Sequence, residues 1–214
     1  MSLNYAQKLK VMASSEKDRV YCWDVDGVLI KFDAQNPAND WRKTLVDENL
    51  LQTWEEFQKS PAWRHCLCDA NADTLFWLED FLEKTGADKR QAKMMVRTWL
   101  TGNITPDLKT LEILKDLRNQ GYQCAIASNQ DGLRAKRLEE WLDSMGLQDV
   151  PRFFSCRMGI AKPDKRFYQK IQDSLAREPG DFYLIDDSEE YIQAALTEGW
   201  HGQLVRPGFS PVLP

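Results

Sequence analysis

The chain has 214 residues, a length that suits one large domain or a domain core with an insertion. Hydrophobic residues make up 43% of it and aromatic residues 11%, which excludes a disordered chain. The net charge of -5 comes without a basic block, so we expect no nucleic-acid partner. No apolar stretch approaches the roughly 18 residues of a membrane span, so we expect no membrane partner.

The cysteines and histidines further limit the kinds of site that the chain can form. The five cysteines are odd in number and form no Cys-x-x-Cys pair, which favours reduced thiols in a cytoplasmic protein. The N-terminal segment lacks the apolar centre of a signal peptide. Only His65 and His201 are present, so neither a histidine-rich metal site nor a histidine-based triad is expected.

The first predicted element is a buried strand over residues 20–23, an apolar and aromatic run. It ends in Asp24 and Asp26, and Gly27 then allows a sharp turn. Two carboxylates at the end of a core strand are costly unless a positive charge accompanies them. A divalent cation with oxygen ligands is the first candidate, and an acidic strand end leading into a solvated turn is the alternative.

Residues 41–103 have helical periodicity and no convincing strand. Apolar positions indicate helices around residues 45–57, 75–82 and 94–100, with breaks at Pro61, Gly86 and Gly102. Five of the eight tryptophans fall in this region, and we interpret them mainly as packing residues. The region therefore predicts a small all-helical cap over residues 33–104.

Strands and helices alternate after residue 104. We predict strands over 122–127, 153–156, 182–185 and 202–205, and helices over 105–120, 133–145, 163–175 and 188–198. Thr105 is the expected N-cap of the first of these helices, with Pro106 in its first turn. This alternation implies a parallel sheet with helices on both faces, formed by residues 1–32 and 105–214.

Polar side chains follow three of the predicted strands. Besides Asp24 and Asp26, these are Ser128 with Asn129 and Asp186 with Asp187. Ligands in parallel α/β sheets bind beyond the carboxyl ends of the strands, so we expect these side chains to form one site.

The order of the segments DVDGVL, SN, KPD and IDDS resembles the four motifs of the haloacid dehalogenase superfamily. The resemblance implies a Rossmann-like α/β core. It is greatest to the phosphatases with a helical cap, because the fourth motif has two adjacent acids and is followed by the segment AALTEG. The 102 residues between Asp26 and Ser128 place that cap between the first and second motifs.

The resemblance also implies roles for these residues. Asp24 is the expected nucleophile, which forms an aspartyl-phosphate, and Asp26 is the expected general acid and then base. Mg²⁺ is the implied cofactor. Its implied ligands are the Asp24 carboxylate, the Asp26 backbone carbonyl and Asp187, with Asp186 binding directly or through water.

The remaining motif residues are expected to hold the phosphoryl group. Ser128 is implied as a hydroxyl donor and Asn129 as a backbone N–H donor to its oxygens. Lys162 is implied to neutralise the transferring charge and restrain the nucleophile.

The resemblance implies a magnesium-dependent phosphatase of small phosphomonoesters, with sugar phosphates as the first substrate class and nucleoside monophosphates as the next. A dehalogenase of the same fold lacks an acid at the position of Asp26, which argues against that alternative. A phosphomutase stays open. A non-enzymatic phospho-accepting signalling module of the receiver type has its acids in a different chain order.

Overall fold

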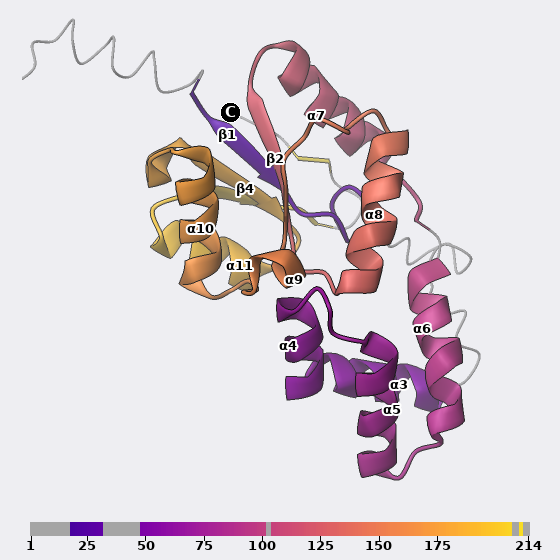
Figure 1. The fold of residues 1–214 in the computed structure, drawn as a ribbon. Helices are drawn as coiled ribbons and strands as arrows, with labels where there is room; N and C mark the ends of the chain where they lie inside the picture. The colour runs from indigo at the N-terminus through magenta and orange to yellow at the C-terminus, as the bar shows by residue number, and fades with distance from the viewer. Residues whose placement is uncertain (1–17, 32–47, 102–103, 207–209, 212–214) are drawn as a thin grey trace, which may run out of the picture.

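The computed structural model describes residues 18–31, 48–101, 104–206 and 210–211, and every structural statement below concerns these residues. The arm expected over residues 4–17 and the first part of the predicted cap lie outside them. Figure 1 shows an α/β part with a layer of helices beyond one end of its sheet.

The sheet has five parallel strands in the order β3-β2-β1-β4-β5. These are β1 (Val20–Trp23), β2 (Gln123–Ser128), β3 (Arg152–Phe154), β4 (Phe182–Asp186) and β5 (His201–Leu204). In the register of the central strands, Trp23 pairs with Ile126 on one side and Ile185 on the other. The carboxyl ends of β1, β2 and β4 therefore lie level at one edge, and the predicted Rossmann-like α/β fold is confirmed.

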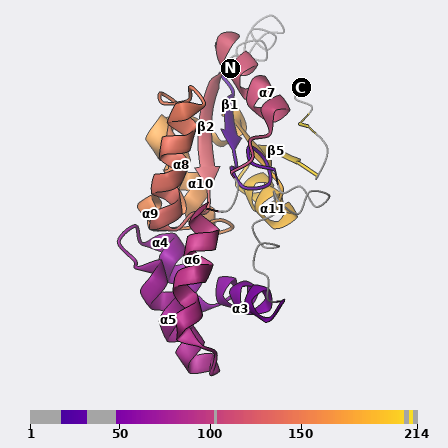
Figure 2. The same cartoon turned by 90° about the vertical axis from the view of Figure 1, so that its right-hand side faces the viewer.

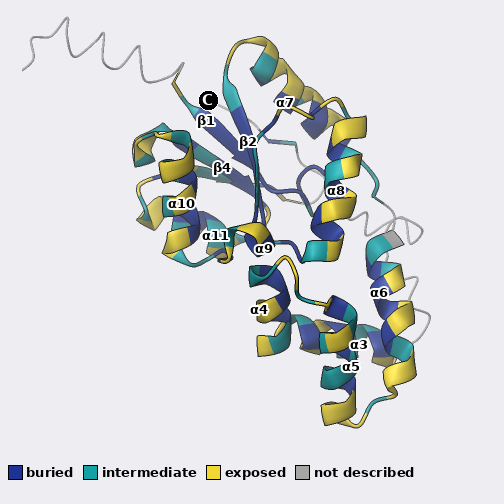
Figure 3. Ribbon diagram, viewed as in Figure 1, coloured by how far each residue is buried: buried dark blue, intermediate teal, exposed yellow. Residues whose placement is uncertain are grey.

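Helices cover both faces of the sheet (Figures 1 and 2). They are α7 (Leu108–Asn119) and α8 (Gly132–Ser144) on one face, and α10 (Lys165–Leu175) and α11 (Glu189–Thr197) on the other. Alternate residues of β1 point to opposite faces: Tyr21 and Trp23 pack with α7 and α8, and Val20 and Cys22 with α10 and α11. Burial on both faces explains why β1 is an unbroken apolar run (Figure 3).

Four other helices form what we call the helical layer, α3 to α6. They are α3 (Glu48–Gln58), α4 (Pro61–Cys68), α5 (Thr74–Thr85) and α6 (Ala92–Thr101). The layer has its own core, in which the rings of Trp54 and Trp63 contact each other and both contact the rings of Phe57 and Trp99. The cap boundaries at residues 33 and 104 remain a prediction.

Turn residues set the ends of the helices in this layer. Pro61 was expected to break a helix, and it also begins the next one, since it is the first residue of α4, where its missing N–H costs nothing. The Ser60 hydroxyl caps this helix by accepting a hydrogen bond from the Trp63 N–H. Gly86 ends α5 in a left-handed conformation with φ of 76°. None of the helices in the described part of the chain has the length and apolarity needed to cross a membrane.

Several predicted boundaries are wrong by one to three residues, and two of them have a clear physical cause. Asp107, not Thr105, caps α7, because its carboxylate accepts the N–H groups of Lys109 and Thr110, while Pro106 pairs with Ile30 before the helix begins. Strand β3 ends at Phe154, and the expected strand residues Ser155 and Cys156 instead begin α9 (Ser155–Met158). Ser155 leaves the strand direction because its hydroxyl bonds to the backbone of Gln130.

Candidate active site at the carboxyl edge of the sheet

Three carboxylates gather where β1 and β4 end. Asp24 follows β1, Asp186 is the last residue of β4, and Asp187 follows it. Each offers a carboxylate oxygen, and these oxygens all lie within 4.8 Å of one another. The level strand ends cause this meeting, since the Asp24 N–H donates to the Ile185 carbonyl at 2.9 Å.

Lys162 supplies a positive charge to this cluster. It lies in the connection between α9 and α10, before a cis peptide bond to Pro163, and its side chain is fully buried. The ammonium donates to Asp24 Oδ1 at 2.9 Å, to Asp186 Oδ2 at 2.5 Å and to the Ala127 carbonyl at 2.9 Å. Burial opposes its charge, but the carboxylates of Asp186 and Asp24 outweigh burial and raise the pKa of Lys162.

One ammonium does not balance three carboxylates. Burial, together with the charges of Asp186 and Asp187, raises the pKa of Asp24 to about 8 against the opposing effect of Lys162. Asp187 as a whole residue is exposed, but desolvation of its carboxylate beside the cluster and the charge of Asp186 raise the pKa of Asp187 to about 6. A hard divalent cation with oxygen ligands removes this excess of negative charge, so the donor set fits Mg²⁺.

Gly27 makes room for Asp187. Its φ is 84°, in the left-handed region, and a Cβ built there would overlap the Asp187 carboxylate. The glycine therefore permits the turn after Asp26 and also lets Asp187, the residue after β4, approach the loop that follows β1.

We predict that Gly27→Ala lowers both stability and activity. The left-handed backbone alone costs roughly 1–2 kcal/mol for a residue with a Cβ, and the added methyl group displaces Asp187. Gly86→Ala is the matched control, because Gly86 has a similar φ of 76° and open space around it. Urea unfolding measures the stability of both variants, and hydrolysis of a generic aryl phosphate, the activity that the sequence resemblance implies, measures their turnover. Equal activity of Gly27→Ala and Gly86→Ala would show that activity does not depend on the close approach of Asp187 to Gly27.

Ser128 and Asn129 lie on the same edge, after β2. The Ser128 side chain is buried, and its hydroxyl accepts a hydrogen bond from Gln130 Nε2 at 2.9 Å. The Asn129 side chain binds the backbone of Lys162: Oδ1 accepts its N–H at 2.9 Å and Nδ2 donates to its carbonyl at 3.0 Å. Asn129 thus fixes the lysine loop, a contact that the motif alone did not indicate, and its expected phosphate contact remains a prediction.

Asp26 lies beside the three-carboxylate cluster, where it contacts Arg134 and Gln130. Neither contact was predicted. The helical pattern could have indicated Arg134. This residue lies one turn before Leu138 on the buried face of α8, where an arginine is unusual. Tyr191 was also missed; its ring centroid lies 4.9 Å from the Lys162 ammonium.

A cavity of about 280 Å³ opens beside these groups. From the α/β part it is lined by Asp24, Asp26, Ser128, Asn129, Gln130, Asp187 and Tyr191, and from the helical layer by Gln58, Trp63, Leu67 and Trp99. It therefore joins the strand ends to a largely apolar wall.

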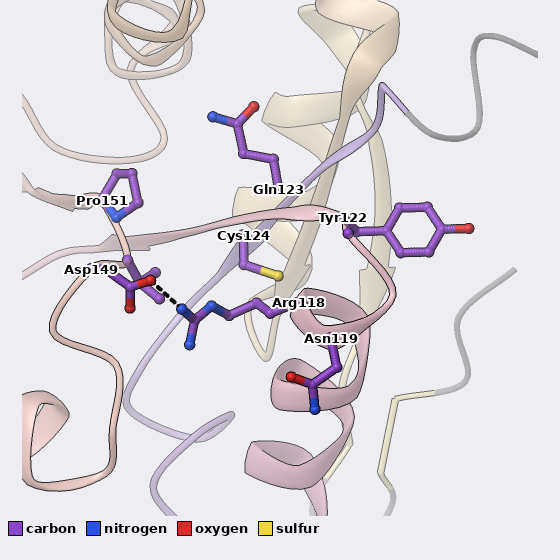
Figure 4. A pocket seen from close by; sticks show the side chains of 9 residues that line it. Arg118, Asn119, Tyr122, Gln123, Cys124, Asp149 and Pro151 are labelled. Atoms are coloured by element: carbon purple, nitrogen blue, oxygen red, sulfur yellow. Dashed lines mark hydrogen bonds and ion pairs between the residues drawn. The ribbon is translucent and has the colours of Figure 1, made fainter.

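A second hollow, of about 400 Å³, lies at the opposite end of β2, around Gln123 and Cys124 (Figure 4). Arg118 and Asp149 form an ion pair there. This hollow is remote from the carboxyl edge and from the predicted site residues.

The parallel sheet with polar groups at its carboxyl edge defines an α/β protein of the ligand-binding, doubly wound class. The sequence model of the haloacid dehalogenase-like hydrolase family matches residues 19–198. The chain belongs to this family of hydrolases.

Comparison with individual proteins agrees with this assignment. The chain is 25% identical over 183 residues to the sesquiterpene phosphatase astK of Aspergillus oryzae, covering 84% of this chain and 86% of that protein. The family enzyme bt-2542 of Bacteroides thetaiotaomicron has a similar fold, with a TM-score of 0.66, 18% identity, and 89% of this chain and 95% of that chain covered. The L-2-haloacid dehalogenase of Xanthobacter autotrophicus also has a similar fold, with a TM-score of 0.60 and 18% identity. The match covers 87% of this chain and 77% of that chain.

Proposed function

We propose that the protein is a magnesium-dependent phosphatase of small phosphomonoesters. The observation that carries the proposal is the meeting of the Asp24, Asp186 and Asp187 carboxylates, two of which, those of Asp24 and Asp186, bind the buried ammonium of Lys162. Structures of bt-2542 contain magnesium and inorganic phosphate, and the Aspergillus relative is a phosphatase by name, which supports the same chemistry.

In this proposal the Asp24 carboxylate attacks phosphorus and becomes an aspartyl-phosphate. Asp26 protonates the leaving oxygen and then takes a proton from the water that hydrolyses the intermediate. Lys162 holds Asp24 in place and, with the Ser128 hydroxyl, stabilises negative charge on the phosphoryl oxygens.

Asp24, the Asp26 carbonyl and Asp187 would hold Mg²⁺. Asp186 is already engaged by Lys162 and by the Ser188 N–H at 2.9 Å, which makes Asp187 the better direct ligand. When bound, the ion supplies charge neutralisation and orients the phosphoryl group.

The cavity wall bears on the substrate class. Trp63, Leu67 and Trp99 present apolar surface, and Gln58 adds a neutral amide. Such a wall suits a largely apolar organic group, while an adjoining cavity that shares Trp63 and Leu67 also has polar and charged residues in its lining. We therefore place apolar phosphate esters beside the sugar phosphates and nucleoside monophosphates that the sequence resemblance favours.

A panel of phosphate esters tests this proposal, with phosphate release as the readout. It contains an isoprenoid alcohol phosphate, an aryl phosphate, several sugar phosphates and nucleoside monophosphates, each with Mg²⁺ and with EDTA. We expect release that stops with EDTA, returns with added Mg²⁺, and is fastest for the apolar esters. Release that ignores EDTA would refute the metal dependence, and no release from any ester would refute the phosphatase.

A further inference from the structure

Asp26 is held from two sides by side chains of the α8 region. Arg134 Nη2 donates to Asp26 Oδ1 at 2.6 Å, and Arg134 Nε lies 3.3 Å from Oδ2. Gln130 Nε2 donates to Oδ2 at 2.8 Å. Both donors are buried, and the arginine fork fixes the carboxylate plane as well as its position.

The helical layer in turn holds Arg134. Its Nη1 donates to the Trp99 carbonyl at 2.9 Å, and its guanidinium carbon lies 4.2 Å from the centroid of the Trp99 ring. The Trp99 indole N–H donates to Asp131 Oδ2 at 2.9 Å, and Asp131 Oδ1 accepts the Thr74 hydroxyl at 3.1 Å. Residues of α5 and α6 thus meet the first turn of α8 in a buried network.

Packing reinforces this junction. A Cβ at Gly132 would overlap the Ala70 carbonyl, so the start of α8 and the loop between α4 and α5 lie in direct contact. Arg134 is a costly residue to bury, and its contacts with Asp26 and with Trp99 together satisfy the guanidinium. Moving α6 away from α8 would remove the Trp99 contacts of Arg134.

We propose that Arg134 is a positioning residue that aims Asp26 at the reacting oxygen, and that Trp99 of the helical layer holds Arg134 in place. Seating of the helical layer on α8 then sets the orientation of the acid at the strand edge. The inference rests on the proposed function, because it takes Asp26 as the acid and base. Since Arg134 and Gln130 only donate hydrogen bonds to Asp26, the proton that Asp26 gives to the leaving oxygen comes from solvent before the reaction.

A double-mutant cycle of Arg134→Lys and Asp26→Asn tests the proposal. Lysine keeps the positive charge but cannot donate two parallel hydrogen bonds to the Asp26 carboxylate. We therefore expect kcat for an alkyl phosphate to fall about 100-fold, the loss in rate that a displacement of about 1 Å causes. KM is expected to change little. In the Asp26→Asn background the same change is expected to cost less than about threefold, because coupled residues are not additive. An activated aryl phosphate, whose leaving oxygen needs less protonation, should lose less than the alkyl ester.

Two results would overturn the positioning role: an equal loss from Arg134→Lys in both backgrounds, or unchanged kcat in Arg134→Lys. Failure of the proposed function is a separate result, since native protein would then release no phosphate from either ester.

Trp99→Phe tests the link to the helical layer. It keeps a ring over Arg134 and removes the N–H that binds Asp131, so kcat is expected to fall in the native background and to change little in the Asp26→Asn background. Because Trp99 also lines the cavity, any change in KM is expected to be equal in the two backgrounds. Trp141→Phe is the control, because Trp141 is a partly buried α8 residue that packs against the core away from the site. Equal kcat for these two variants would contradict the link.

Discussion

Lys162→Met is expected to abolish phosphate release and to destabilise the protein severely. The native ammonium lies between Asp24 and Asp186, with all three groups buried. Removing one partner of a buried ion pair leaves uncompensated charge and costs about 3–5 kcal/mol. Urea unfolding in EDTA measures this loss of stability.

Two comparisons make the Lys162 result specific. Lys165→Met makes the same chemical change at an exposed position three residues later, and we expect native stability and activity. Adding Mg²⁺ should raise the melting temperature of Lys162→Met, since a bound cation replaces part of the lost charge. Equal unfolding curves for the two lysine variants would show that the buried ammonium does not hold the acids together.

The sheet was predictable because its strands are buried on both faces. A central parallel strand such as β1 is a short, unbroken apolar run that ends abruptly in polar residues. The polar ends of β1, β2 and β4 then coincide in space because parallel strands end at one edge. The grouping of Asp24, Asp186 and Asp187 follows from that rule, and the approach of Lys162 followed only from the family resemblance.

The missed features depend on contacts between distant segments. Thr105 is a good cap by composition, but Asp107 caps α7 because the preceding residues pair with the β1 loop. The pairing of Arg134 with Asp26 joins residues that are 108 apart in sequence. Trp99 of the helical layer then accepts a further hydrogen bond from Arg134. Local pattern shows that Arg134 is out of place on a buried stripe, but it does not show which carboxylate it meets.

Asp24→Asn is the second substitution with a very large expected effect. Asparagine keeps the shape and can still accept the Lys162 hydrogen bond, but it does not attack phosphorus. We expect turnover to fall at least about 10⁴-fold, the scale of losing a nucleophile, with the fold retained. Circular dichroism and steady-state phosphate release measure the two effects.

Asp149→Asn is the control for this change. Asp149 lies in the hollow at the other end of β2, so its variant should keep native turnover (Figure 4). Native turnover in Asp24→Asn would show that Asp24 is not the nucleophile.

The central claim is that the phosphoryl group passes through the Asp24 carboxylate, and the most direct measurement locates that group. Native protein and Asp26→Asn are mixed with Mg²⁺ and a labelled, activated aryl phosphate, whose leaving oxygen needs little protonation. The reactions are quenched in acid, digested and analysed by mass spectrometry. We expect the label on Asp24 in both proteins, with more of it in Asp26→Asn, where hydrolysis of the intermediate is slow. Phosphate release without any label on Asp24, or label on another residue, would contradict the claim.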